Sequence, residues 1–316
     1  MKKYLEDLKT ALNELGFGEQ EIADILRDHE EMITEAIAGG LAEQDIEQKF
    51  GSPEKVAHDL SDMCRHGDIA ADPSTEGWNP AGKFAVPDEK FNVLFRLASE
   101  DLTVEKGEGS EIAVFTKGRG SLDQFEFGFF DGQFVVRRKS KTTSSWFHRE
   151  GLDFLIRIPA NAKVGTISQH TASGDFVYSG VTSEGIEVNT ASGDGFIRDC
   201  ACQNFAFHAV NGDLHFVDVT CIDMTIGQVS GDVRFERAHC TGDIEINNTS
   251  GDVTLLDSEC KRAFFHTVSG DLEGTEFYPE SVELRSVSGD ISIHNKDFTR
   301  KIIVTSAKSV SGSVRI

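Results

Sequence analysis

Apolar residues recur every three or four positions through the first part of the chain, which is the spacing of one buried helix face. One stripe stops at Gly16 and a second at Gly39-Gly40, a third short helix fits residues 42–50, and Ser52-Pro53 starts a fourth. Helices this short are marginal alone in water, so they must pack on one another or on a partner. The pattern therefore predicts a small helical bundle over residues 1–66.

The pattern changes after this module. Residues 67–83 show no periodicity and are rich in Gly, Pro and small polar residues, which predicts a linker. From about Phe91 onward, apolar and polar residues alternate in short runs that are separated by Gly or Asp. This alternation predicts β-structure over residues 84–316.

One short phrase, Ser-Gly-Asp or a close variant, returns eight times from Ser173 onward, and its glycines stand 19 or 20 residues apart except for a last interval of 23. Such regularity is the signature of a solenoid, in which each coil stacks on the previous one. Glycine suits a corner because it tolerates positive φ, and neighbouring Ser or Asp side chains can bond the backbone of the turn. The turn glycines are Gly174, Gly193, Gly212, Gly231, Gly251, Gly270, Gly289 and Gly312.

Four apolar columns keep constant offsets from these glycines and define the expected core. They lie seven and five residues before each glycine and two and four after it, as Met224, Ile226, Val233 and Phe235 do around Gly231. These offsets predict short strands joined by corners and stacked about 4.8 Å apart. The predicted fold class is α plus all-β in separate domains: the small helical bundle, then a single-chain β-solenoid (β-helix-like) with coils of about 19 residues.

The charge of the chain narrows its range of partners. The formal net charge is −22, and residues 1–66 alone hold 16 acidic and 7 basic side chains, which leaves −9. This negative charge disfavours binding to nucleic acid and to anionic membranes. The helical module also lacks the Lys and Arg that a DNA-binding helix-turn-helix needs for phosphate contacts. Partners are expected to be neutral, cationic or bridged by a metal.

Features of the sequence also bear on location. Glu6 and Asp7 stand where the apolar region of a signal peptide would lie, and no apolar run reaches the roughly 18 residues of a membrane span. Six cysteines in 316 residues favour reduced thiols over a disulfide scaffold. We expect a cytoplasmic protein, with the cell envelope or surface as the alternative.

Two polar columns raise the question of metal binding. Zinc needs four ligands that converge, whereas a ladder spreads its sulfurs along an axis, so a structural cysteine ladder is preferred, although Cys200 leaves a local pair open. The aspartate column from Asp175 to Asp290 is read as turn-stabilising, because the Gly-Gly-x-Gly-x-Asp repeat of calcium-binding rolls is missing. No metal or cofactor is predicted. The ladder comprises Cys202, Cys221, Cys240 and Cys260.

One segment departs from the acidic character of the chain. Basic residues with neighbouring aromatic rings can hold a phosphate, an anionic glycan or a peptide, while the alternative is a solvated loop between two strands. The segment is the best candidate for a local binding loop. Its residues are Arg137, Arg138, Lys139, Lys141, Trp146, Phe147 and Arg149.

Catalysis is not expected. A polysaccharide-cleaving β-helix would need clustered carboxylates or a basic residue in a groove, whereas the acids here stand in evenly repeated columns. The histidines are scattered over different offsets, and no GxSxG, HExxH, P-loop or dinucleotide fingerprint is present.

The last residues, Val314-Arg315-Ile316, stand within a coil, and the inward-facing columns are still occupied there. We therefore expect a strand edge without a partner and self-association through it, end to end or side by side.

Two resemblances cover nearly the whole chain. The runs Glu21-Ile22 to Glu30-Glu31 and Phe50-Gly51-Ser52-Pro53 resemble the bacterial helical signalling domain called HAAS, which is often linked to PadR-type transcriptional regulators. The part entered through Ile158-Pro159 and built on Ser-Gly-Asp coils resembles the bacterial β-strand-repeat family known as putative adhesin, whose function is unknown. Many relatives place a membrane helix between the two parts, but here only the polar stretch 67–83 lies between them.

The sequence thus predicts a non-catalytic bacterial scaffold or interaction protein, regulatory or active in envelope-stress signalling. The helical module would dock a protein partner, such as a transcriptional regulator or a membrane-associated protein, and the solenoid would present a surface for binding or self-association. The alternatives are a cell-surface adhesin and, after it, a carbohydrate-active β-helix enzyme.

Overall fold

A computed structural model describes residues 2–14, 22, 26–27, 33–34, 37, 46, 52–54, 77–139 and 151–316. The chain divides into two compact units, Met1–Asp72 and Pro73–Ile316. In the first unit, helix α1 (Lys2–Glu14) buries Tyr4, Leu8 and Leu12, which pack with Ile22, Ile33 and Ile46. The buried face follows the three-and-four spacing that predicted this helix. The other three expected helices lie largely outside the described residues.

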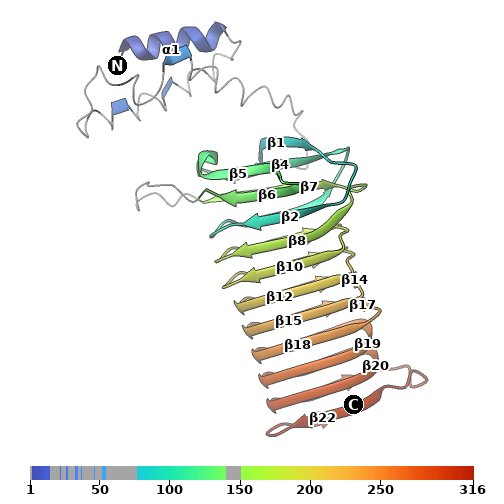
Figure 1. Cartoon of the computed structure of the whole chain (residues 1–316). Coiled ribbons are helices and arrows are strands. Elements are labelled where there is room, and N and C mark those ends of the chain that lie inside the picture. Colours follow the sequence, from blue (N-terminus) through green and yellow to red (C-terminus); the bar gives the residue numbers. More distant parts are fainter. Residues whose placement is uncertain are drawn as a thin grey trace. The chain divides into compact units, whose positions relative to one another are not determined.

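The second unit is a β-solenoid of stacked coils, as predicted (Figure 1). Equivalent strands of successive coils pair in parallel and in register, as Cys221 of β14 (Thr220–Cys221) does with Cys240 of β17 (His239–Cys240). The repeated coils contain β8 (Val164–Thr171), β9 (Phe176–Ser179), β10 (Gly185–Thr190), β11 (Gly195–Arg198), β12 (Asn204–Asn211), β13 (Leu214–Val217), β14 (Thr220–Cys221), β15 (Asp223–Ser230), β16 (Val233–Glu236), β17 (His239–Cys240), β18 (Asp243–Ser250), β19 (Val253–Ser269), β20 (Leu272–Ser288) and β21 (Ile291–His294).

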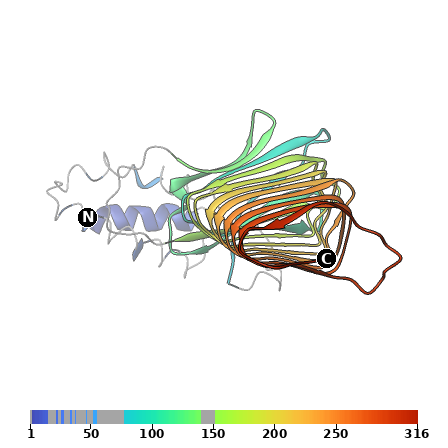
Figure 2. The same cartoon turned by 90° about the horizontal axis from the view of Figure 1, so that it is seen from below.

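A coil has up to three strand segments separated by two corners. In one coil, β12 runs up to the corner at Gly212, β13 follows that corner, and β14 follows a second corner at Asp218. Seen from below, the coils superpose on one another and enclose a single interior (Figure 2). The 19-residue period is the length of one turn around this interior.

The four predicted core columns fill the interior, which confirms the assignment made from the repeat. Met224, Ile226, Val233 and Phe235 are each at most 1% exposed. Equivalent side chains stack from coil to coil, and the rings of Phe216 and Phe235 lie 4.8 Å apart and 9° from parallel. The core is therefore one continuous column of apolar side chains in which each coil supports the next.

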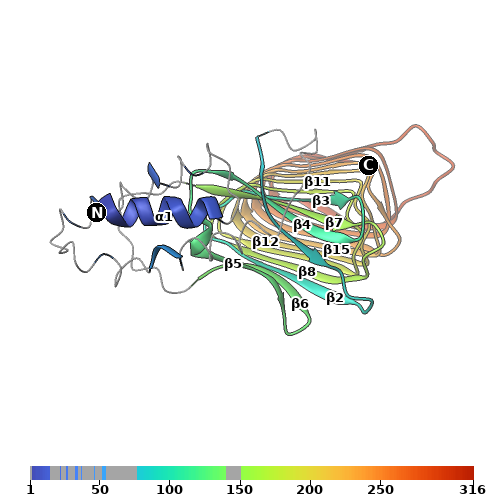
Figure 3. The same cartoon turned by 90° about the horizontal axis from the view of Figure 1, so that it is seen from above.

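A mixed layer closes the N-terminal end of the solenoid (Figure 3). Strands β2 (Phe91–Arg96) and β3 (Leu102–Gly107) stack in parallel on β8 and β9, and β6 (Gln133–Arg138) and β7 (Leu152–Pro159) stack in parallel on β2 and β3. The antiparallel pairs are β1 (Asn79–Ala85) with β4 (Glu111–Gly118), β4 with β7, and β5 (Phe125–Phe130) with β6. A cluster of rings plugs this end, with Phe84 contacting Phe127 and Phe134. The elements are β1 (Asn79–Ala85), β2 (Phe91–Arg96), β3 (Leu102–Gly107), β4 (Glu111–Gly118), a 3₁₀ turn (Leu122–Gln124), β5 (Phe125–Phe130), β6 (Gln133–Arg138) and β7 (Leu152–Pro159).

Strand β1 corrects one sequence-based boundary. It begins at Asn79, inside the stretch 67–83 that was expected to be a linker, and pairs with β4. Its Pro80 suits an edge strand, where a missing N–H disturbs no second ladder. The β-unit therefore starts before residue 84.

Candidate functional site

The C-terminal end of the solenoid differs from its closed N-terminal end. The last strands are β22 (Ile303–Ser309), which pairs with β20, and β23 (Val314–Arg315), which pairs with β21. Apolar side chains lie on the surface here: Phe298 is 88% exposed, Val310 79% and Ile303 64%. Such a group of exposed large apolar residues marks an interaction surface more often than a random surface does. We call residues 295–316 the open end.

A cavity of about 660 Å³ lies at the open end. Apolar and charged side chains both line it, so the hollow could take a ligand or a side chain with both characters. Its lining includes Glu276, Ile293, Phe298, Arg300, Ile302 and Ile316.

The loop between β21 and β22 lines part of this cavity, and contacts of Asn295 and Arg300 hold it. The Asn295 side chain bonds the backbone of Phe277 twice, at 2.9 and 2.6 Å. The Arg300 guanidinium lies 4.1 Å above the Tyr278 ring and donates to Glu259 at 2.6 Å. The loop is thus anchored at both ends, and Phe298 projects from the part between them.

The aspartate column forms a continuous hydrogen-bond ladder. The backbone N–H of each aspartate donates to Oδ1 of the aspartate one coil before it, at 2.7–2.8 Å, from Asp175 through Asp290, and Ser313 closes the series. The bond from the Ser313 backbone is the largest cause of the lowered pKa of Asp290. Donation to each carboxylate compensates for the stacking of like charges, which supports the turn-stabilising interpretation over calcium binding.

Substitution within this ladder separates the two interpretations. Asp232→Ala removes the acceptor of the Asp252 N–H and should lower the free energy of unfolding by about 1 kcal/mol. Asp232→Asn keeps an oxygen acceptor and should unfold at the wild-type urea midpoint. Millimolar calcium should leave the urea midpoints of the wild type and of Asp232→Asn unchanged. If calcium instead raised the midpoint of the wild type but not that of Asp232→Asn, the column would be a cation site.

The turn glycines allow the coils to approach closely at this corner. From Gly174 to Gly289 the seven residues have φ between +121° and +147°, and a Cβ added at Gly231 would lie 2.1 Å from the carbonyl oxygen of Gly212. Gly312 occupies the same place above Gly289, although its φ is not in this range. Both the conformation and the contact therefore require glycine from Gly174 to Gly289, and at Gly312 the contact alone does.

Sequence reasoning missed the first step of this corner. Asp101 accepts from the Asp175 backbone, and Glu100 stands where later coils have glycine. Glu100 is 3% exposed, and its carboxylate accepts from the N–H of Ala98 at 2.6 Å and pairs with Arg138, which also lies over the Phe125 ring. Glu100 thus caps the ladder. This first step has no Ser-Gly-Asp phrase in the sequence, but Ser99-Glu100-Asp101 shares its serine and its aspartate.

The predicted binding loop is only partly within the described residues. Arg138 is occupied by Glu100, Arg137 donates to Glu126 at 2.7 Å, and the Lys139 side chain is exposed at the end of β6. The two arginines therefore have partners within the fold and are less available to a ligand. Lys141, Trp146, Phe147 and Arg149 lie outside the described residues, and their role stays a prediction.

The cysteine ladder lies inside the solenoid. Cys202, Cys221, Cys240 and Cys260 are buried thiols on successive coils, and Sγ of Cys221 is 2.7 Å from Sγ of Cys240. Burial raises the pKa of Cys202 to about 12 and that of Cys200 to about 11. At neutral pH these groups are protonated and shielded, whereas metal binding and redox chemistry need an accessible thiolate.

We expect these thiols to resist alkylation in the native protein. Iodoacetamide should label none of the four ladder cysteines below the unfolding transition and all four above it, because the folded protein buries each thiol away from the reagent. Peptide-level mass spectrometry measures the labelling of each cysteine. Rapid native labelling of Cys221 or Cys240 would show that the ladder opens or ionises, contrary to its buried position.

A second corner column was also missed. Six residues after each turn glycine from Gly174 to Gly270 the backbone again adopts positive φ, at Gly180 and then at a run of charged residues. Aspartate tolerates this conformation better than most residues, which is a signal that the sequence did contain. The charged members are Asp199 (52°), Asp218 (54°), Arg237 (54°), Asp257 (47°) and Glu276 (51°).

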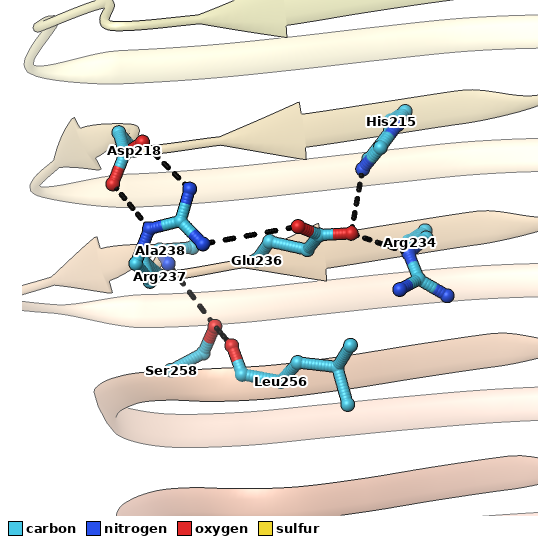
Figure 4. A network of polar contacts seen from close by, with 8 residues as sticks. All are labelled: His215, Asp218, Arg234, Glu236, Arg237, Ala238, Leu256 and Ser258. Carbon is cyan, nitrogen blue, oxygen red and sulfur yellow. Dashed lines mark hydrogen bonds and ion pairs between the residues drawn. The ribbon is translucent and has the colours of Figure 1, made fainter.

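Charged side chains on neighbouring coils pair along the outer surface (Figure 4). Glu236 accepts from Arg234 at 2.7 Å and contacts His215 at 3.1 Å, and the bond from Arg234 is the largest cause of its lowered pKa. Arg237 donates hydrogen bonds to both carboxylate oxygens of Asp218, at 2.6 and 2.8 Å. His215 therefore belongs to a surface network of polar contacts that crosses the coils.

Within the described part of the chain, no group of three or more His, Cys, Asp or Glu side chains is arranged to hold a metal ion. The same residues include no helix with the length and apolar character needed to cross a bilayer.

Comparison with known proteins matches both parts of the chain to families. Residues 3–59 match the HAAS family, and residues 92–244 and 218–316 match the family described as Toastrack DUF4097, which together make more than half of the chain. No curated protein sequence matches the chain.

Solved structures resemble the β-unit. One, from Parabacteroides distasonis ATCC 8503, is described as a putative lipid binding protein; it has a TM-score of 0.51 and 13% identity, over 75% of this chain and 97% of that one. Another, a putative adhesin from the same organism, has a TM-score of 0.50 and 10% identity, over 76% and 97%. At these identities the likeness shows the fold.

Proposed function

Because the chain belongs to the Toastrack DUF4097 family and carries a HAAS domain at its N terminus, we propose that it is a non-catalytic interaction protein. In this proposal the solenoid is a rigid scaffold, its open end is a docking surface for protein, and the helical module connects the scaffold to a regulatory partner.

The contrast between the two ends of the solenoid carries this proposal. At the N-terminal end, the rings of Phe91, Phe125 and Phe134 are at most 4% exposed beneath the mixed layer. At the open end, Phe298, Ile303 and Val310 are mostly exposed, and Phe298 also lines the cavity. Exposing large apolar side chains to water is unfavourable, so a partner that covers them would gain binding free energy.

The helical module supplies the regulatory part of the proposal. Its resemblance to a signalling domain suggests a transcriptional regulator or a membrane-associated protein as partner and envelope stress as the signal. We place the protein in the cytoplasm, with the cell envelope as the alternative, because unlinked neighbouring thiols such as Cys221 and Cys240 suit a reducing compartment.

Affinity capture from native lysate tests the docking surface. The baits are the full chain, the same chain with Phe298→Ser and Val310→Ser, and a matched control with Val210→Ser and Val229→Ser, which alters half-exposed valines on the side of the solenoid. We expect the wild type and the control to retain the same proteins and the open-end variant to lose them. Circular dichroism confirms that all three baits are folded.

Adhesion is the second candidate and has a different expected result. An adhesin that uses the side of the solenoid would retain envelope protein or glycan with the open-end variant and lose it with the Val210 and Val229 variant. That outcome would move the binding surface from the open end to the side and would contradict the proposal.

A further inference from the structure

The open end is positively charged on a strongly negative protein. Residues 295–316 contain five basic side chains and one acidic one, whereas the whole chain has a net charge of −22. Lys301 and Lys308 are exposed and form no ion pair with any residue that the structure describes. Lys296, with 90% of its side chain exposed, reaches Glu276 only at 3.7 Å.

Charge and apolar exposure coincide at this end. Lys308 lies on β22 with the exposed Ile303 and Val304, and Lys301 lies in the loop that presents Phe298. A surface of this kind fits a partner that combines carboxylates with apolar side chains, because ion pairing steers and orients the partner while apolar burial stabilises the complex.

The N-terminal module of the same protein offers both kinds of side chain. Residues 1–66 have a formal charge of −9. The stripe of Tyr4, Leu8 and Leu12 is buried inside the module, but Leu5, Leu26 and Ile37 are only partly buried. Glu6 and Glu54 are exposed on its described part. Two open ends brought together would instead place like charges opposite each other, which is unfavourable.

We propose that the open end binds the acidic helical module of a second copy of this chain, so that molecules associate head to tail. The inference rests on the proposed function of the open end as a docking surface and names its occupant. A head-to-tail contact uses two different surfaces, so a bound pair leaves one open end and one module free and the assembly can grow beyond a dimer. A contact between two open ends would close at two copies.

Sedimentation velocity of the full chain at increasing protein concentration tests this arrangement. We expect a mass that rises beyond two copies and falls as salt is added, because exposed charges are screened. Two double variants each remove one surface: Lys301→Glu with Lys308→Glu at the open end, and Glu6→Lys with Glu54→Lys on the module. Glu187→Lys with Glu245→Lys, two exposed positions on the side of the solenoid, changes the net charge by the same amount as the module variant and is its matched control.

The decisive measurement mixes the two variants. Each should be monomeric alone, and an equimolar mixture should form a one-to-one heterodimer, because one molecule supplies an intact module and the other an intact open end. The control variant should associate like the wild type. The inference is overturned if the wild type stays monomeric at the highest concentration. It is also overturned if the wild type forms only a dimer and the module variant forms the same dimer. If the Phe298 and Val310 variant still loses its lysate proteins, the proposed function stands without it.

Discussion

Gly231→Ala should destabilise the solenoid by about 3–5 kcal/mol, a large fraction of the stability of an ordinary domain. Gly231 has a φ of +127°, a region that side chains with a Cβ rarely adopt. The added Cβ would also lie 2.1 Å from the Gly212 carbonyl oxygen, so the two coils would have to separate. Separation would disturb the Asp232 and Asp252 bonds at the same corner. Urea unfolding followed by circular dichroism measures the loss.

Gly109→Ala is the matched control for this substitution. Gly109 also has positive φ, at +86°, but a Cβ there would meet nothing within 4 Å. Its cost should be only that of the backbone conformation, about 1 kcal/mol. Equal losses in the two variants would mean that the close approach of the coils contributes nothing, contrary to the packing described above.

Glu100→Ala should cost about 2–4 kcal/mol, because it removes a buried carboxylate that several donors share. Its side chain is only 2% exposed and pairs with Arg138. The N–H groups of Ala98 and Ser99 would lose their acceptor at the first step of the ladder. Since later coils stack on this step, unfolding should begin at the N-terminal layer, and hydrogen exchange should show faster exchange in β2 and β3.

Glu126→Ala removes the neighbouring ion pair and serves as the control. Glu126 pairs with Arg137, which precedes Arg138 on β6. Both side chains of this pair are about a third or more exposed, and solvent screens such pairs. The hydrogen bond from Arg137 lowers the pKa of Glu126, yet no measurable change in the urea midpoint is expected. A loss as large as that of Glu100→Ala would show that burial does not distinguish the two pairs.

The repeated part of the fold could be predicted because its information is local and recurs. Every coil has apolar residues at the same offsets from its turn glycine, so an exception in one coil does not obscure the pattern. The inward position of Phe235 or Ile226 follows from the column to which it belongs. The coil length and the parallel register follow from the same period.

The features that sequence reasoning missed depend on contacts between distant segments. Glu100 meets Arg138 across 38 residues, and nothing in the local pattern of either residue indicates the pair. The cluster of rings at the N-terminal end brings Phe84 against Phe127 and Phe134, which lie on strands outside the repeated coils, so no column of the repeat predicts these contacts. The positive charge of the open end is a local excess within an acidic chain, so it becomes visible only when residues 295–316 are treated as one surface.

Site-specific photo-cross-linking in the native cell tests the central claim, the use of the open end for protein contacts. A photoreactive phenylalanine analogue replaces Phe298 in one full-length version and Phe130 of β5, which is 36% exposed, in a second. We predict covalent protein adducts from position 298 and none from position 130. Adducts from position 130 alone, or from neither position, would contradict the assignment of the open end as the docking surface.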